Sequence, residues 1–224
     1  MEELIAKENA IFDILQRFID AKLDFVIVGG YAVSAYKHRF SVDADIVLHS
    51  SDLEKFEAIM KKEGFSKTRE KELENMYSSK FMRYKNDAVS VDMLIDGLAS
   101  RSTDASFSYE LLANHASKRK IIGTEKTIET LVPSKEMIII MKIHSGRLTD
   151  FRDIAALAKD TNIETIRKFL FIGNIKVVQD NLDKLQKTVK DKNFVDSFKG
   201  VFMEKKFDID MKQVEKIANL KQSK

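Results

Sequence analysis

The sequence has no cysteine, no tryptophan and only one proline, and it has no long apolar run. Without a thiol, the chain forms no disulfide bond and no cysteine-ligated metal site. Its longest apolar runs, such as residues 137–141, are far shorter than the about 20 residues that cross a bilayer. The opening MEELIAKENA lacks the apolar core of a signal peptide. We therefore expect a cytoplasmic protein with no membrane partner.

Charge is nearly balanced over the chain but is unevenly distributed along it. The 224 residues include 38 Lys and Arg against 35 Asp and Glu, and a net charge of +3 does not by itself imply a nucleic-acid partner. From residue 161 onward there are 14 Lys and Arg against 9 Asp and Glu. This basic C-terminal part has two interpretations, a contact with a polyanion or a set of solvated helix faces.

The most informative stretch covers residues 25–48, FVIVGGYAVSAYKHRFSVDADIVL. Its first four residues are apolar and partly β-branched, which predicts a buried strand. Gly29 and Gly30 then allow a sharp turn and a close approach of the backbone. Residues 31–37 suit a short helix, and the N–H groups at its start would offer a site for phosphate.

A second apolar run in this stretch carries Asp43 and Asp45. Side chains two apart in a strand share a face, so these carboxylates project together while Ala44 and Ile46 point into the core. Two unit charges 4 Å apart repel by about 4 kcal/mol at an effective dielectric constant near 20, so such a pair usually holds a cation. Mg²⁺ suits the pair, because it takes one or two carboxylates and fills its shell with water and phosphate oxygens.

Two later segments carry charged residues in apolar surroundings. Residues 80–85 and 88–95 alternate like the strands of a hairpin, with Asp92 as a lone carboxylate. The residues of this hairpin alone allow Asp92 to be an edge-strand acid that faces solvent. Beyond Pro133 every segment reads as helix, and Lys142 lies in an apolar one. The ammonium either reaches water or serves an anion; without nucleotide we expect Asp43, Asp45 or Asp92 to pair with it.

The arrangement of these residues resembles a known signature. Val28-Gly29-Gly30, followed by Asp43-Ala44-Asp45-Ile46, resembles that of the polymerase-β-like nucleotidyltransferase superfamily. The string Arg39-x-Ser41-x-Asp43-x-Asp45 is most similar to the AbiEii-type nucleotidyltransferases, which include toxins of type IV toxin–antitoxin systems. Lys142…Arg147…Asp150-x-x-Asp153 resembles a motif that these proteins carry after the catalytic domain, although Thr149 stands where the motif has a basic residue.

The resemblance implies an α/β fold, with a mixed sheet flanked by helices in a catalytic domain of residues 1–131 and an all-helical domain of residues 132–224. It implies transfer of a nucleoside monophosphate from an NTP to an acceptor hydroxyl. Two Mg²⁺ ions, with Mn²⁺ as an alternative, would be held by Asp43, Asp45 and Asp92. Asp92 and Lys142 would also act in catalysis, and the nucleotide would be bound by Gly29, Gly30, Arg39, Ser41 and Arg147.

The acceptor is less closely specified. Resemblance to AbiEii-type proteins favours RNA, in particular a tRNA 3′ end, and implies a cognate antitoxin protein as a partner. Transfer to a small hydroxylated compound, such as an aminoglycoside, or to a protein is an alternative. A non-catalytic module that binds nucleotide or RNA is another, although all three carboxylates are present.

Overall fold

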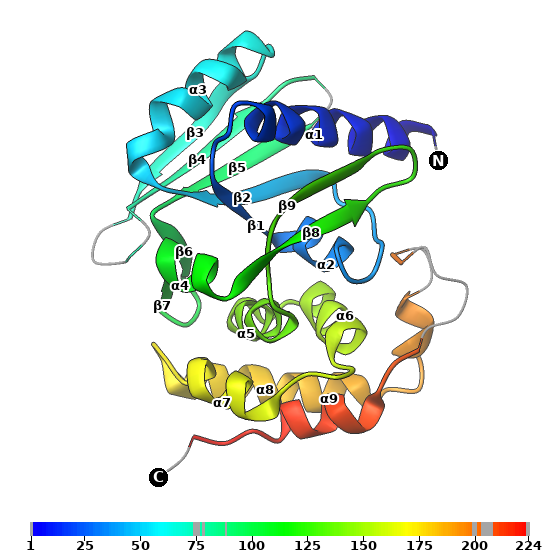
Figure 1. Ribbon diagram of the computed structural model, residues 1–224. Coiled ribbons are helices and arrows are strands. Elements are labelled where there is room, and N and C mark those ends of the chain that lie inside the picture. The colour runs from blue at the N-terminus through cyan, green and yellow to red at the C-terminus, as the bar shows by residue number, and fades with distance from the viewer. Residues whose placement is uncertain are drawn as a thin grey trace. The chain divides into compact units, whose positions relative to one another are not determined.

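The computed structural model describes residues 2–73, 77, 79–87, 89–198, 201–202 and 208–222 (Figure 1). The chain forms two compact units. The first comprises Met1–Ala99 and Ser106–Pro133, and the second comprises Ser100–Ala105 and Ser134–Lys224. The fold is α/β, with a mixed sheet and helices followed by a helical part, as the sequence predicted.

A seven-stranded sheet in the order β3-β4-β5-β2-β1-β9-β8 forms the first unit. Its strands are β1 Phe25–Val28, β2 Asp43–Leu48, β3 Ser66–Glu72, β4 Lys80–Lys85, β5 Ser90–Ile95, β8 Ala116–Ile122 and β9 Thr127–Pro133. The β1–β9 and β2–β5 pairs are parallel and the other described pairs are antiparallel. A ribbon of β6 Gly97–Ser100 and β7 Ala105–Ser108 carries the chain into the second unit and back.

Helices pack on the sheet of the first unit. They are α1 Glu2–Asp20, α2 Gly29–Ser34, α3 Leu53–Lys62 and α4 Tyr109–Asn114, with the 3-10 turn η1 Ser50–Asp52. The rings of Phe18 on α1, Phe25 on β1 and Phe56 on α3 meet in edge-to-face and tilted contacts, with centroids 4.8 to 6.3 Å apart. All three are almost completely buried. This aromatic cluster fixes α1 and α3 against one face of the sheet.

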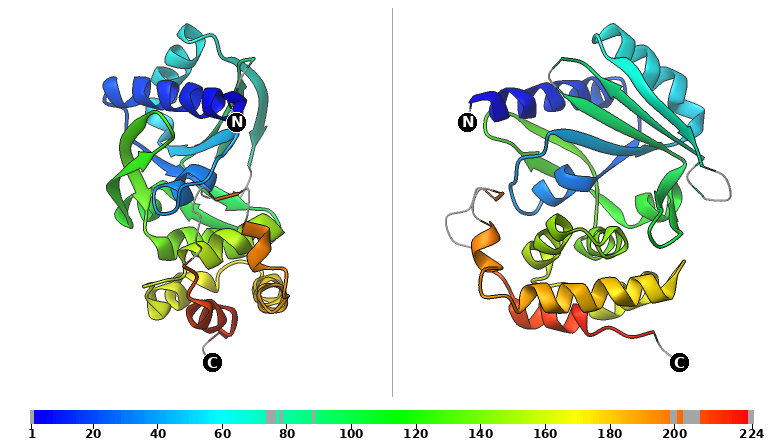
Figure 2. Two further views of the ribbon diagram at one scale, coloured as in Figure 1. Left: turned by 90° about the vertical axis from the view of Figure 1, so that its right-hand side faces the viewer. Right: turned by 180° about the vertical axis from the view of Figure 1, so that it is seen from behind.

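The second unit is helical over its described residues beyond 134. Its elements are α5 Lys135–Ser145, α6 Leu148–Leu157, α7 Ile163–Leu170, α8 Ile175–Val189, η2 Val195–Phe198 and α9 Met211–Ala218, and α8 and α9 lie side by side (Figure 2). Four of the helices begin at a polar cap, Ser134, Asn162, Asn174 or Asp210, whose side chain accepts a backbone N–H of the first turn. No helix of the described residues is long and apolar enough to cross a membrane.

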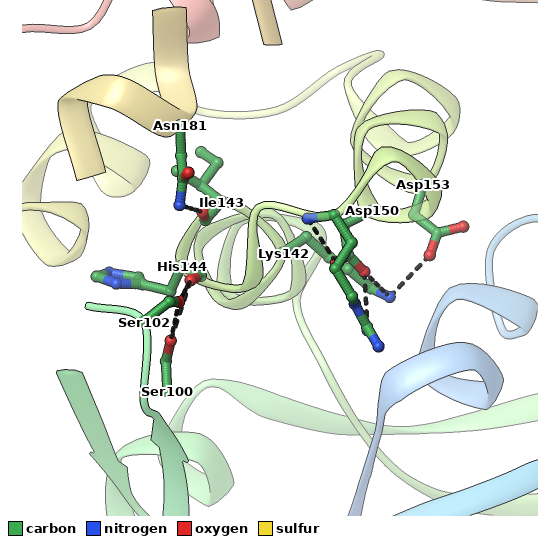
Figure 3. Close-up of polar contacts among 9 residues, drawn as sticks. Ser100, Ser102, Lys142, Ile143, His144, Asp150, Asp153 and Asn181 are labelled. Carbon is green, nitrogen blue, oxygen red and sulfur yellow. Dashed lines mark hydrogen bonds and ion pairs between the residues drawn. The ribbon is translucent and has the colours of Figure 1, made fainter. Parts of the chain in front are cut away.

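His144 attaches the short segment Ser100–Ala105 to the second unit. Its backbone oxygen accepts hydrogen bonds from the hydroxyls of Ser100 and Ser102, at 3.0 and 2.8 Å (Figure 3). Its ring is fully buried, with Nδ1 2.8 Å from Thr103 Oγ1 and Nε2 3.0 Å from the Leu170 carbonyl oxygen. Because a carbonyl only accepts, Nε2 carries the proton and Nδ1 accepts from the threonine.

Acid is expected to destabilise the second unit through this histidine. Burial lowers the pKa of His144 to about 4, against the opposing effect of the Leu170 carbonyl, whereas an unfolded imidazole titrates near pH 6.5. The neutral His144 ring therefore contributes its full stabilisation above pH 6.5, and this contribution is lost as the pH falls toward 4. The free energy of unfolding should drop by about 2 kcal/mol between pH 8 and pH 5 for this reason.

Urea unfolding at the two pH values checks this expectation. In His144→Gln the drop should be smaller than in the natural protein by about that amount. His49→Gln serves as control, because the His49 side chain is 47% exposed, and it should keep the full drop. An equal drop in the natural protein and in His144→Gln would show that His144 does not cause the loss of stability in acid.

Candidate functional site

The two predicted carboxylates lie together on β2. Asp43 and Asp45 are half-buried, whereas Ala44 and Ile46 are fully buried, so the predicted alternation of faces is confirmed. β2 lies between β1 and β5 near the middle of the sheet. Both carboxylates are therefore held on a rigid element at its N-terminal end.

The glycine pair makes room for side chains of the site. Helix α2 begins at Gly29, so the prediction that the helix starts at residue 31 is wrong, and the glycines form its first turn. Gly29 has φ +65, and a Cβ atom there would lie 2.0 Å from Asp45 Oδ2. A Cβ atom at Gly30 would lie 2.4 Å from Ser41 Oγ. Larger residues would displace Asp45 and Ser41.

Residues of α2 hold the loop that leads to β2. The Tyr31 hydroxyl donates to the Ser41 carbonyl oxygen at 3.0 Å, and burial raises the pKa of this hydroxyl, which keeps it protonated. Ser34 Oγ donates to the Arg39 carbonyl oxygen at 2.9 Å and accepts from the Arg39 N–H at 3.2 Å. Ser41 Oγ in turn lies 3.4 Å from Asp43 Oδ1. The structure thus brings the predicted residues Gly29, Gly30, Arg39, Ser41, Asp43 and Asp45 together.

Asp92 lies beside these carboxylates. In the parallel β2–β5 pair it is directly opposite Asp45, and residues paired in this way share a face. Asp92 is only 4% exposed and β5 is an inner strand, so the alternative of an edge-strand acid facing solvent is wrong.

Both oxygens of Asp92 bind one arginine that the sequence did not point to. Arg83 on β4 donates from Nε to Asp92 Oδ1 at 2.6 Å and from Nη2 to Oδ2 at 2.5 Å. The hydrogen bond with Asp92 raises the pKa of Arg83, and the charges of Asp43 and Asp45 raise it further. Arg83 is therefore a fixed cation beside all three carboxylates. Alternation along β4 was visible in the sequence, but the pairing of Arg83 with Asp92 depends on the register of the β4–β5 hairpin.

Of the three carboxylates, those of Asp43 and Asp45 are placed to bind a divalent cation. Among the described residues, no group of three or more His, Asp or Glu side chains is arranged around a common metal position. Asp43 and Asp45 supply carboxylate oxygens on one strand face, which fits Mg²⁺ because this ion needs only one or two carboxylates. Asp92 is engaged by Arg83, so its use as a third ligand requires Arg83 to move.

Lys142 lies in a buried network with Asp150 and Asp153 in the second unit (Figure 3), and Arg147 joins this network at Asp150. Lys142 Nζ lies 2.8 Å from Asp150 Oδ1 and 2.7 Å from Asp153 Oδ2, and both aspartates are fully buried. Arg147 Nε donates to Asp150 Oδ2 at 2.8 Å. Burial raises the pKa of Asp150, but the hydrogen bond from Arg147 and the charge of Lys142 outweigh it and lower this pKa to about 2.

This network corrects one expectation. In the absence of nucleotide Lys142 was expected to pair with Asp43, Asp45 or Asp92, whereas it pairs with Asp150 and Asp153 on α6, the following helix. The spacing of the motif after residue 142 therefore has a structural explanation: one buried lysine joins two buried aspartates across consecutive helices.

The steric role of Gly29 leads to a prediction. Gly29→Ala should lower the free energy of unfolding by more than the roughly 1–2 kcal/mol cost of a left-handed alanine, because the new methyl group also meets Asp45. Gly64→Ala is the matched control. Gly64 has φ +77 with nothing within 4 Å of its Cβ position, so this variant should show the effect of backbone strain without a steric clash. Equal losses in the two variants, measured by urea unfolding, would show that Asp45 does not closely approach Gly29.

No protein-family model and no curated protein matches this sequence. Solved structures do match. The solution structure of the antibiotic-resistance factor ANT(2'')-Ia shares 17% identity over 72% of this chain and 88% of that chain, with a TM-score of 0.52. The crystal structure of ANT(2'')-Ia in complex with adenylyl-2''-tobramycin shares 15% identity over 71% and 92%, with a TM-score of 0.51.

A third similar structure is the lincomycin-bound lincosamide antibiotic adenylyltransferase LnuA, at 21% identity over 69% of this chain and 98% of that chain, with a TM-score of 0.48. The two matches to ANT(2'')-Ia establish a likeness of fold. This chain has the fold of the nucleotidyltransferase ANT(2'')-Ia.

Proposed function

We propose that this protein transfers a nucleoside monophosphate from an NTP to an acceptor hydroxyl, in a site built on Asp43 and Asp45. The observation that carries the proposal is the convergence of these carboxylates with Gly29, Gly30 and Ser41 at the adjoining ends of β1 and β2. A fold shared with a nucleotidyltransferase supports it. So does the resemblance of the sequence to polymerase-β-like and AbiEii-type proteins.

Each residue then has a defined role. Asp43 and Asp45 would hold Mg²⁺, or Mn²⁺, which when bound would supply positive charge beside the phosphates. Gly29 and Gly30 let the triphosphate approach the backbone, and Arg39 and Ser41 offer it donors from the loop. The acceptor oxygen forms a bond to the α-phosphorus as the bond to pyrophosphate breaks.

Asp92 accepts the proton of the acceptor hydroxyl in this proposal, and with Arg83 displaced it also contributes to metal binding. Until then Arg83 holds the Asp92 carboxylate in one orientation through two hydrogen bonds. Of the two cations in the second unit, Arg147 is accessible, since its side chain is 70% exposed, whereas Lys142 is enclosed. We assign neutralisation of the leaving pyrophosphate to Arg147 first, and to Lys142 only if it leaves Asp150 and Asp153.

RNA, and a tRNA 3′ end in particular, is the acceptor that we propose, with an antitoxin protein as the corresponding partner. A small hydroxylated compound is the second candidate, because ANT(2'')-Ia, whose fold this chain shares, was crystallised with adenylyl-2''-tobramycin.

Incubation with each α-labelled NTP and Mg²⁺, with total RNA or with a mixture of aminoglycosides, tests the proposal. Label in RNA supports transfer to RNA, and label in an aminoglycoside supports the second candidate. Label on protein would require a protein acceptor. Binding of NTP with no labelled product from any acceptor would overturn the enzymatic proposal and leave a binding module.

A further inference from the structure

The site lies on a sheet face that continues past the carboxylates. Strand pairing aligns Asp45, Asp92, Arg83 and Arg69 in one row across β2, β5, β4 and β3. Three strand spacings separate the ends of this row, roughly 14 Å. A second row places Phe81 on β4 opposite Lys71 on β3. The face therefore changes from acidic to basic with distance from β2.

The side of β4 that carries Phe81 and Arg83 is open, whereas α3 covers the opposite side. Met82 and Tyr84 are at most 4% exposed, and the Tyr84 hydroxyl donates to Glu57 of α3. Phe81 and Arg83, which alternate with them, are only half-buried, and the Arg83 side chain is 32% exposed. The Arg83 guanidinium carbon lies 5.9 Å from the centre of the Phe81 ring. A cation and an aromatic ring thus stand together on the open side.

A β-bulge brings two further cations to this side. Lys67 is opposite Tyr84 and Arg69 is opposite Arg83, so the register shifts at Thr68. Lys67 consequently lies on the covered side, 2.6 Å from Glu70 and 3.6 Å from Glu57. Without the shift, simple alternation would place Lys67, Arg69 and Lys71 on one side.

Past the bulge, Arg69 and Lys71 are exposed and lie on the same side as Arg83. In the described part of the chain neither of them pairs with a carboxylate. No described carboxylate therefore neutralises these two cations.

We propose that the β3–β4 face, formed by Arg69, Lys71, Phe81 and Arg83, binds the terminal nucleotides of a single-stranded polynucleotide acceptor. Its end hydroxyl lies toward Asp45 and Asp92. Cations suit the phosphates and the aromatic ring suits a stacked base, which is how single strands are bound without sequence preference. A drug-sized acceptor does not need a basic surface that extends roughly 14 Å from the carboxylates. The inference rests on the proposed function, whose acceptor it specifies.

Binding is measured without NTP or Mg²⁺, by the fluorescence anisotropy of a labelled single-stranded oligoribonucleotide over a range of salt concentrations. Lys71→Gln should weaken binding and reduce the log–log salt slope by about 0.7, as the loss of one phosphate contact would. Lys67→Gln is the matched control: the same substitution on the same strand, but on the covered side, so it should leave the slope unchanged. Equal slopes in the two variants would overturn the proposal.

Phe81→Leu distinguishes stacking from charge. It keeps an apolar side chain, so it should raise Kd about tenfold through lost stacking and leave the salt slope unchanged. Circular dichroism melting checks that each variant folds. An unchanged Kd in folded Phe81→Leu would contradict the use of this ring.

Crosslinking and transfer separate this inference from the proposed function. Crosslinks from 4-thiouridine RNA to β3 and β4 peptides, in a protein that transfers no nucleotide, would support RNA binding at the β3–β4 face and overturn the proposed nucleotidyl transfer. If Lys71→Gln transfers nucleotide to RNA as efficiently as the natural protein, with crosslinks confined to α8 and α9, the proposed function would be supported and RNA binding at the β3–β4 face would be overturned.

Discussion

Asp43→Asn and Asp45→Asn should each reduce nucleotidyl transfer by a factor of at least about 10³, because loss of metal-based charge stabilisation costs several kcal/mol in the transition state. Each variant should be as stable as the natural protein in the absence of metal, or more stable, since the amide removes the repulsion between neighbouring carboxylates. The two carboxylates share one strand face and are half-buried, so this repulsion is only partly screened.

Thermal melting with and without Mg²⁺ checks both parts of the expectation. The natural protein should melt at a higher temperature with Mg²⁺, and the two variants should lose this gain. Asp87→Asn, in the exposed turn between β4 and β5, is the control and should behave like the natural protein. Strong destabilisation of either site variant with its Mg²⁺ response intact would make the pair structural.

Lys142→Met should lower the free energy of unfolding by about 3–5 kcal/mol, because it leaves Asp150 and Asp153 buried without their shared cation. The sequence alone did not predict this cost, because it led us to expect Asp43, Asp45 or Asp92 as the partner of Lys142. Arg147 also binds Asp150, but its side chain is 70% exposed and does not replace a buried ammonium.

A triple variant, Lys142→Met with Asp150→Asn and Asp153→Asn, tests the explanation. Removing the charges of both aspartates should recover most of the lost stability, because the cost comes from uncompensated buried charge. The same variant reports on catalysis. Near-normal transfer in a stable triple variant would confine Lys142 to the buried network, whereas a loss of about 10²–10³-fold would give it the electrostatic role that the family resemblance implies.

Local alternation of apolar and polar residues was read correctly from the sequence, whereas the start of α2 was not. The alternation of Asp43 and Asp45 with Ala44 and Ile46 follows from the strand period of two. The hairpin of β4 and β5 was also predicted from its alternation, and the structure confirms it.

Features that depend on pairing between elements could not be predicted in this way. The Arg83–Asp92 contact needs the hairpin register, and the side on which Lys71 lies depends on one bulge at Thr68. The partners of Lys142 come from the packing of α5 on α6. The segment Ser100–Ala105 joins the second unit through hydrogen bonds to His144, and its composition gives no sign of this.

The most direct test of the central claim is a comparison of two labelled positions in one NTP. With an α-phosphate label, the natural protein and Mg²⁺ should produce a labelled acceptor, and with a γ-phosphate label the radioactivity should appear only in released pyrophosphate. Asp45→Asn should give neither product. Transfer of the γ-label to the acceptor, or an unchanged yield from folded Asp45→Asn, would contradict nucleotidyl transfer at this site.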